Sequence, residues 1–208
     1  MAKHIYWSQH APIERRPMEL VGSGTDRELT EIGIRRAHQI GSGMLHLIEA
    51  GVIKNASGTI FSSPLKRAVA TAEIVGHTLG FDIVVREELR AQHFGVLEGK
   101  TKEEIERDEG LARHLHSNLP PERLFYDEAP GGESVKSTYE RMSVIRNELF
   151  YETLGNPIVI THGSVLKTLV GSVCERPLEE WGSITREFKG RIIEDQKLTL
   201  QSLDYPQS

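Results

Sequence analysis

The chain has little of several features that mark particular protein classes. One cysteine among 208 residues excludes an internal disulfide framework and a metal site built from several thiolates. No run approaches the roughly 18 apolar residues that span a bilayer, and the first residues lack the apolar core of a signal peptide. The formal charge of −5 is the opposite of the basic excess of a nucleic-acid surface. We therefore expect a soluble, cytoplasmic protein that binds neither nucleic acid nor membrane.

What the chain does contain is typical of a globular domain. Hydrophobic residues make up 38% and charged residues 26%, close to the averages for folded proteins. No linker, internal repeat or low-complexity tract divides the sequence. We predict a single domain over residues 1–208, with an insertion at about 100–131 that is rich in charge, histidine and proline.

Short apolar runs alternate with amphipathic ones along the first half of the chain. We predict strands at His4–Ser8, Thr59–Ser62 and Phe81–Val85, and a helix at Leu29–Ala50. A second helix is expected after the middle strand, with Ser63 as its N-cap and Pro64 as its first residue. Strands that alternate with helices imply an α/β protein with a mostly parallel sheet covered by helices.

The second half continues the same alternation. Thr101 and Glu104 form a capping-box pattern in the predicted insertion. A helix at Glu133–Leu154, a buried strand at Pro157–Thr161 and a helix at Val165–Cys174 are then predicted. Near the end, Thr185–Phe188 and Ile192–Leu203 alternate in polarity and predict a hairpin around Lys189-Gly190.

Two histidines directly follow predicted strands, His10 after the first and His162 after the last apolar run. In an open parallel sheet, ligands bind beyond the carboxyl ends of the strands, so these side chains are expected to converge. Arg67 lies near the start of the helix after Ser63, where free backbone N–H groups favour an anion and the guanidinium suits phosphate. Taken singly, each histidine is more often structural, and a zinc site has no supporting His or Cys spacing.

Together these residues resemble the histidine phosphatase superfamily, the phosphoglycerate mutase-like fold. The matching segments, in order, are Gln9-His10-Ala11, Leu29-Thr30-x-x-Gly33, Ser62-Ser63-Pro64-Leu65-Lys66-Arg67-Ala68-x-x-Thr71-Ala72, Phe94-Gly95-x-x-Glu98-Gly99, Pro130-Gly131-Gly132-Glu133-Ser134 and Thr161-His162-Gly163. Each segment alone is weak evidence, but their shared order over nearly the whole chain identifies a divergent member of the family.

The resemblance implies a three-layer α/β/α sandwich and a phosphatase that uses neither metal nor cofactor. His10 is then the nucleophile, and Arg67 and His162 hold the phosphoryl oxygens. Gln9, Arg16, Gly163 and Ser164 are the remaining phosphate-binding candidates. The substrate is expected to be a small phosphorylated compound or a phosphoprotein. Because His10 must be neutral to attack, activity should fall below its pKa, near 6.5 if unperturbed.

Two departures from the family pattern bear on activity. Gln9 stands where the family has arginine before the nucleophile, and Ala91 stands where some members have the acid that protonates the leaving group. Arg16, with Arg15 beside it, is a candidate to restore the charge. Candidate acids are Glu88 and His93, with Glu87, Glu14 and Glu133 also near in sequence.

Three functions follow from this reading. A missing acid favours substrates with good leaving groups, such as acyl phosphates, over sugar phosphates. The first function is therefore a phosphoric monoester or activated-phosphate hydrolase. The alternative is a weak or inactive relative that binds a phosphate ligand or acts as a regulatory protein. A protein-interaction module that uses the predicted insertion is the third.

Overall fold

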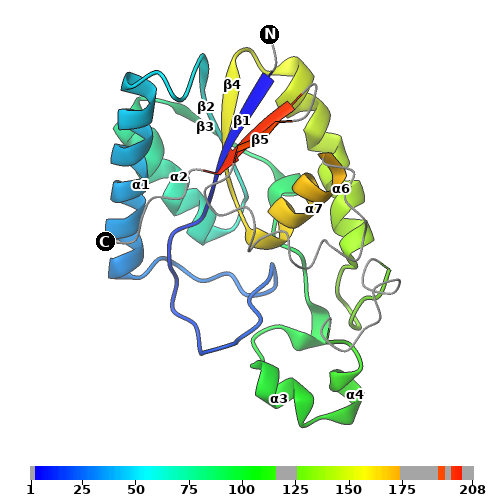
Figure 1. Ribbon diagram of the computed structural model, residues 1–208. Coiled ribbons are helices and arrows are strands. Elements are labelled where there is room, and N and C mark those ends of the chain that lie inside the picture. The colour runs from blue at the N-terminus through cyan, green and yellow to red at the C-terminus, as the bar shows by residue number, and fades with distance from the viewer. Residues whose placement is uncertain (1–2, 116–125, 174–191, 195–197, 203–208) are drawn as a thin grey trace.

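The computed structural model describes residues 3–115, 126–173, 192–194 and 198–202 (Figure 1). Six strands form one sheet in the order β3-β2-β4-β1-β6-β5. Their bounds are β1 Lys3–Gln9, β2 Ala56–Ser62, β3 Asp82–Val85, β4 Asn156–Thr161, β5 Ile192–Glu194 and β6 Leu198–Ser202. All neighbouring strands are parallel except β5, which pairs antiparallel with β6. The predicted parallel α/β sheet is therefore confirmed.

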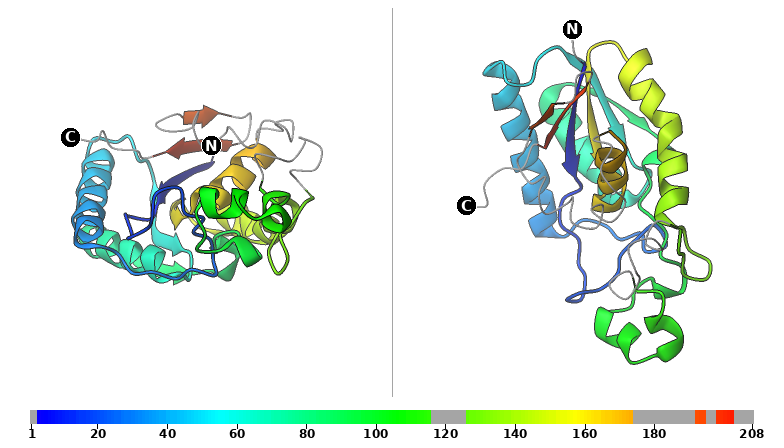
Figure 2. Two further views of the ribbon diagram at one scale, coloured as in Figure 1. Left: turned by 90° about the horizontal axis from the view of Figure 1, so that it is seen from below. Right: turned by 45° about the vertical axis from the view of Figure 1, so that its right-hand side comes forward.

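Helices cover both faces of this sheet. Helices α1 (Glu31–Glu49) and α2 (Lys66–Leu79) lie on one side, and α6 (Val135–Asn147) and α7 (Gly163–Val173) lie on the other (Figure 2). A π-helical turn at Glu148–Glu152 continues α6. The three-layer α/β/α arrangement is confirmed. No helix in the described ranges has both the length and the apolar character to cross a membrane.

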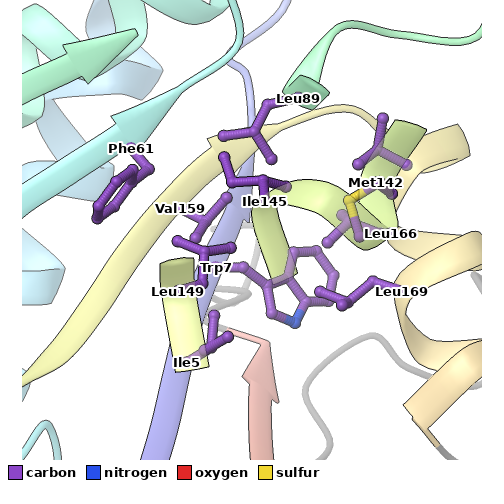
Figure 3. Close-up of a cluster of buried hydrophobic side chains, with 11 residues drawn as sticks. Ile5, Trp7, Phe61, Leu89, Met142, Ile145, Leu149, Val159, Leu166 and Leu169 are labelled. Atoms are coloured by element: carbon purple, nitrogen blue, oxygen red, sulfur yellow. The ribbon is translucent and has the colours of Figure 1, made fainter. Parts of the chain in front are cut away.

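Two hydrophobic cores result from the alternation of side chains along the strands. On β1, Ile5 and Trp7 pack with α6 and α7, whereas Tyr6 packs with α1 and α2. Figure 3 shows the first core, in which Trp7 lies beside Leu166 and Leu169. All six residues of the central strand β4 are buried. Since both faces of β4 are covered, its middle residues Pro157–Ile160 form a continuous apolar run rather than an alternating one.

The start of α2 differs from the prediction. The helix begins at Lys66 rather than at Pro64, and its first N–H donates to Oδ1 of Asp26 across 2.8 Å. Ser63 is therefore not the N-cap. Its hydroxyl accepts from the N–H of Leu65 at 3.3 Å and contacts His162. A carboxylate from a distant loop caps this end of α2, so the N-terminus predicted to be free for an anion has a partner here.

The starts of the other predicted helices also shift by two residues. Thr30 caps α1 by accepting from the N–H of Gly33 at 3.0 Å. Helix α6 starts after Ser134, and α7 starts at Gly163, two residues before the predicted start. The predicted end of α7 at Cys174 lies outside the described residues.

The second arm of the predicted C-terminal hairpin is divided in the structure. Strands β5 and β6 both come from this segment and pair antiparallel, so the chain reverses between Glu194 and Leu198, whereas the reversal predicted at Lys189-Gly190 lies outside the described residues. Parallel pairing of β6 with β1, which brings Leu198 opposite Lys3, places this segment in the sheet. Thr185–Phe188 lies outside the described residues.

The segment after β3 extends beyond the end of the sheet where β1 and β4 finish (Figure 1). It begins with two short 3₁₀ helices, η1 (Glu87–Leu89) and η2 (Gly95–Leu97), followed by α3 (Lys102–Glu106) and α4 (Glu109–Ala112). The predicted capping box is present, because Thr101 and Glu104 each bond the other's backbone N–H. The segment has a small core of its own, formed by Leu97, Ile105, Leu115 and Ala129.

Candidate active site

The structure brings His10, Arg67 and His162 together beyond the carboxyl ends of β1, β2 and β4. The backbone N–H of His10 donates to the carbonyl of Thr161 at 3.0 Å, which ties the residue after β1 to the end of β4. The imidazole rings of His10 and His162 lie 5.0 Å apart between centroids and are tilted by 54°. Arg67, from the first turn of α2, donates from Nε to Nε2 of His10 across 3.3 Å.

The hydrogen bonds of His10 define its protonation. Nδ1 lies 2.8 Å from the carbonyl oxygen of Ala11. A carbonyl only accepts, so the ring proton is on Nδ1, and Nε2 keeps the lone pair that faces Arg67. The pKa of His10 is lowered to about 4, mainly by burial; the bond to Ala11 opposes this shift, and the charges of Arg67 and Arg15 add to it. The pKa is therefore shifted from the unperturbed value of 6.5, and the ring is neutral well below neutral pH.

Arg67 is a buried cation, only 1% exposed. Its Nη1 donates to the carbonyl of Thr25 at 2.8 Å and its Nη2 to that of Gly22 at 2.9 Å. Burial lowers the pKa of Arg67, and the nearby carboxylates of Asp26 and Glu98 oppose this. Within the described part of the chain no carboxylate forms an ion pair with it. Because neutral carbonyls do not compensate its positive charge, this buried guanidinium can attract an anion.

Glu98 orders the loop that holds Arg67. Its carboxylate accepts from the N–H of Gly22 at 2.9 Å, the N–H of Gly24 at 3.1 Å and the hydroxyl of Thr25 at 2.9 Å. It also accepts from the N–H of Phe94 at 3.1 Å. The sequence marked Glu98 only as part of a family-like segment and gave no indication of this role.

His162 is 3% exposed and has one partnered ring nitrogen. Nε2 lies 2.7 Å from Oγ of Ser63. Nδ1 is buried and has no hydrogen-bond partner among the described residues. Burial holds the pKa of His162 well below its usual range, and His10, Arg67 and Arg141 lower it further. A neutral imidazole with an unpartnered buried nitrogen beside His10 and Arg67 fits a site that takes a polar ligand.

Three further candidates border these side chains. Gln9 is exposed at the end of β1, where it pairs in register with Thr161. Gly163 and Ser164 follow His162 as the first residues of α7, an 11-residue helix. Oγ of Ser164 accepts from the N–H of Gln92 at 3.2 Å. Gln9, Gly163 and Ser164 therefore lie next to the central histidines in the chain, and each remains a predicted phosphate contact.

The structure separates the two neighbouring arginines of the first loop. Arg16 donates to both oxygens of Glu104, at 2.6 and 3.0 Å, and to the carbonyl of Gly99. This pairing lowers the pKa of Glu104 to about 2. Arg15 is exposed and makes no hydrogen bond or ion pair with any described residue, and its charge acts on His10. Arg16, the predicted substitute for the missing charge, is thus engaged with the segment that carries α3.

The candidate acids are divided among other partners. Ala91 is buried, at 2% exposure, and provides no carboxyl group. Glu87 pairs with Arg90, and Glu133 accepts from Arg141 at 3.1 and 3.0 Å. Glu88 acts electrostatically on Arg86. The pKa of Arg86 is raised mainly by its hydrogen bond to Glu148 and, more weakly, by the charge of Glu88. Glu14 is exposed and lines a surface cavity with Arg15, Arg16 and Arg27.

His93 is the candidate acid for which a hydrogen bond fixes the position of the ring proton. Its Nδ1 accepts from the N–H of Gly95 at 2.9 Å, so the neutral ring carries its proton on Nε2. That Nε2 borders Gly24, because a Cβ built on Gly24 would lie 2.8 Å from it. Gly24 belongs to the loop whose carbonyls bind Arg67. The described residues contain no group of three or more His, Cys, Asp or Glu side chains arranged to hold a metal ion.

Comparison with known proteins decides the family. The model of the histidine phosphatase superfamily, branch 1, matches residues 5–189. The chain belongs to this superfamily. The resemblance inferred from the six segments is confirmed, and the membership makes the protein an enzyme of the phosphatase type.

Individual relatives cover most of the chain. A probable phosphoglycerate mutase GpmB from Cronobacter sakazakii is 26% identical over 211 residues, covering 98% of this chain and 86% of the relative. The solved structure of mycobacterial hydrolase 1 matches with a TM-score of 0.68 and 26% identity, over 85% of this chain and 83% of the other. A mycobacterial glucosyl-3-phosphoglycerate phosphatase in complex with VO3 matches with a TM-score of 0.64 and 25% identity, over 85% and 84%.

Proposed function

We propose that this protein hydrolyses small phosphorylated compounds through a phosphohistidine on Nε2 of His10, without a metal ion. The observation that carries the proposal is the unprotonated Nε2 of His10, which faces the buried Arg67 at 3.3 Å beside His162. A neutral nucleophile, a desolvated cation and a second polar ring are what phosphoryl transfer to histidine needs.

The reaction divides into two displacements. In the first, the lone pair of Nε2 attacks phosphorus, an N–P bond forms and the bond to the leaving-group oxygen breaks. In the second, water attacks phosphorus, the N–P bond breaks and its electron pair returns to Nε2. Phosphate leaves, and the proton of the water passes to solvent or to the leaving group. Arg67 and His162 stabilise the charge that develops on the phosphoryl oxygens in both steps.

The leaving group decides which substrates react well. A buried alanine at position 91 cannot protonate an alkoxide, so substrates whose leaving group departs as a stable anion are favoured. We infer a preference for acyl phosphates and other activated phosphates. Phosphoryl exchange between two hydroxyls, as a mutase performs it, needs proton transfer at both, so we infer hydrolysis. His93, with its proton on Nε2, is the donor that we assign for poorer leaving groups.

In this proposal, the loops around the site determine which substrates bind. Residues 11–27 and the start of residues 100–131 meet there, because Leu20 donates to Lys100 at 2.9 Å and Arg16 pairs with Glu104. Surface loops in general tolerate insertion more readily than the strands beneath them. We propose that residues 100–131 are an insertion of the single domain and contact the part of the substrate that remains after phosphate leaves.

The test compares turnover of acetyl phosphate and para-nitrophenyl phosphate by the wild type and by His10→Ala, in buffer containing EDTA. We expect turnover by the wild type only, faster on acetyl phosphate and unchanged by EDTA. Quenching the wild type in alkaline denaturant should retain labelled phosphate on His10, in a bond that is stable in base and labile in acid. Equal, background rates for the two proteins on both compounds would contradict the proposal.

Gln9 and Ala91 support a second candidate, a relative that binds a phosphate ligand without turnover. In that case inorganic phosphate should raise the melting temperature of the wild type while no substrate is hydrolysed. If phosphate compounds leave the melting temperature unchanged as well, both candidates are excluded and an interaction module is the function to test next.

A further inference from the structure

The site described above has one cation fewer than its family-like motifs call for. A phosphoryl group carries close to two negative charges, and Arg67 is the only buried arginine beside His10 in the described residues. Its two terminal nitrogens already donate to the carbonyls of Thr25 and Gly22. Gln9, in the position before the nucleophile, is uncharged. A second cation near His10 is therefore needed to balance the bound group.

Arg16 is held away from this role by three donor contacts, two to Glu104 and one to the carbonyl of Gly99. Glu104 is itself fixed by the capping box with Thr101. Releasing Arg16 toward His10 would break a bidentate ion pair and leave a carbonyl without its donor. This geometry makes Arg16 a link between the first loop and α3.

Arg15 has the opposite surroundings. It lines a surface cavity of about 300 Å³ with Glu14, Arg16 and Arg27. The other two arginines of this cavity face carboxylates, since Arg27 donates to Glu19 at 2.6 and 2.9 Å. Arg15 pairs with no described carboxylate and bonds no described carbonyl. Of the three cations in the cavity, it is the one whose charge is uncompensated.

The backbone around Arg15 is fixed on both sides. Before it, Ile13 forms a β-bridge with Leu29. After it, the N–H of Arg16 donates to Oε2 of Glu19 at 2.8 Å, and Glu19 is 5% exposed. A free guanidinium on an anchored loop needs only rotation of its own side chain to reach a ligand. Such a side chain loses less entropy on binding than one on a mobile loop.

We propose that Arg15 binds the phosphoryl group at His10 and supplies the positive charge that Gln9 lacks. This inference rests on the proposed function, and it replaces Arg16 with Arg15 as the compensating residue. The influence of the Arg15 charge on the ring of His10 agrees with the assignment. The ligand class is a tetrahedral oxyanion, either a substrate phosphoryl group or free phosphate.

The test measures the dissociation constant of inorganic phosphate by calorimetry and kcat/KM for acetyl phosphate. We expect Arg15→Gln to weaken phosphate binding about 10- to 100-fold, the range for one charge-assisted contact. Arg107→Gln, an exposed arginine of the segment after α3, is the matched control and should bind as the wild type does. Adding Gln9→Arg to Arg15→Gln should restore at least part of the lost affinity.

Three results would overturn the assignment. In the first, Arg15→Gln binds phosphate as tightly as the wild type. In the second, Arg16→Gln loses as much affinity as Arg15→Gln. In the third, the defect appears only for substrates with a second anionic group and not for inorganic phosphate, which would place Arg15 at a distal part of the substrate. Phosphate binding is read without turnover, so a wild type that binds phosphate through Arg15 but hydrolyses nothing would reject the proposed function alone.

Discussion

The Nε–H group of Arg67 donates to Nε2 of His10 across 3.3 Å, from a guanidinium that is almost fully buried. His10 follows β1, whereas Arg67 lies in the first turn of α2, 57 positions later in the chain. The bond orients the lone pair of Nε2 in the free protein. In the proposed reaction, a phosphoryl group that enters the site displaces this bond and meets both the nucleophile and the cation in place.

Replacing Arg67 by lysine should remove this arrangement. One ammonium cannot bond two loop carbonyls and still face His10, because it lacks the planar fork of five donors. We expect kcat/KM to fall about 10²- to 10³-fold. Steady-state kinetics on acetyl phosphate measure the loss. Lys66→Gln, at the exposed neighbouring position, should change kcat/KM by less than about threefold, and a similar fall in both variants would argue against a specific role for the guanidinium.

The ring of His10 should titrate near pH 4 rather than near pH 6.5. Burial is the main cause of the low pKa, and the positive charges of Arg67 and Arg15 add to it. Nuclear magnetic resonance of the ring protons in the free protein follows the titration directly. Activity that requires neutral His10 should therefore persist to about pH 5 while the fold is intact. A midpoint at pH 6 or above would contradict the burial seen here.

The same pKa makes stability depend on pH. His10 binds a proton near pH 6.5 in the unfolded chain and near pH 4 in the folded one, so the unfolded state holds more protons between these values. Stability is fully present above pH 6.5 and falls as the pH drops toward 4, by about 3 kcal/mol in total from this group. Urea unfolding at pH 7 and pH 5 should show a smaller pH difference for His10→Gln than for the wild type. Equal differences would locate the pH dependence elsewhere.

Ser63 should matter through His162. Its hydroxyl lies 2.7 Å from Nε2 of that ring, and Ser63→Ala leaves the nitrogen buried without a partner. We expect a loss of about 1–3 kcal/mol in the free energy of unfolding, together with a fall in kcat. Ser62→Ala is the matched control, because that neighbouring buried hydroxyl bonds only a backbone carbonyl. If the two variants have the same kcat, Ser63 does not position His162.

Glu98→Gln should loosen the loop that carries the acceptors of Arg67. Four donors converge on the two oxygens of Glu98, and an amide would turn two hydrogens toward some of them. We expect weaker binding of phosphate and a lower melting temperature than in the wild type. Glu106→Gln, on the exposed side of α3, is the comparison, and an equal shift in both would remove the special role of Glu98.

The sequence was sufficient for the parts of the fold that depend on local pattern. Apolar strands, the capping box at Thr101 and the histidines at strand ends all follow from neighbouring residues. Three features do not. The start of α2 depends on Asp26, 40 positions earlier, and the pairing of Arg16 depends on Glu104, 88 positions later. The low pKa of His10 depends on burial, which only the folded chain has.

The C-terminal strands show the same limit. The alternating pattern indicated strands, but the pairing of β6 with β1 depends on contacts between the two ends of the chain. The alternation therefore did not reveal that the chain reverses within the second predicted segment, between Glu194 and Leu198. Site residues were found because they follow strands, whereas Glu98 acts through backbone groups of a loop and leaves no periodic signal.

Glu98 and Arg67 both hydrogen-bond the backbone of one loop, but to different groups. The carboxylate of Glu98 accepts from the amides of Gly22 and Gly24, and the guanidinium of Arg67 donates to the carbonyls of Gly22 and Thr25. Local opening of this loop thus releases Arg67, and an anion that binds Arg67 disfavours the opening. Hydrogen exchange at the two glycine amides should slow when phosphate binds. The exchange rates of these two amides then report whether an anion occupies the site.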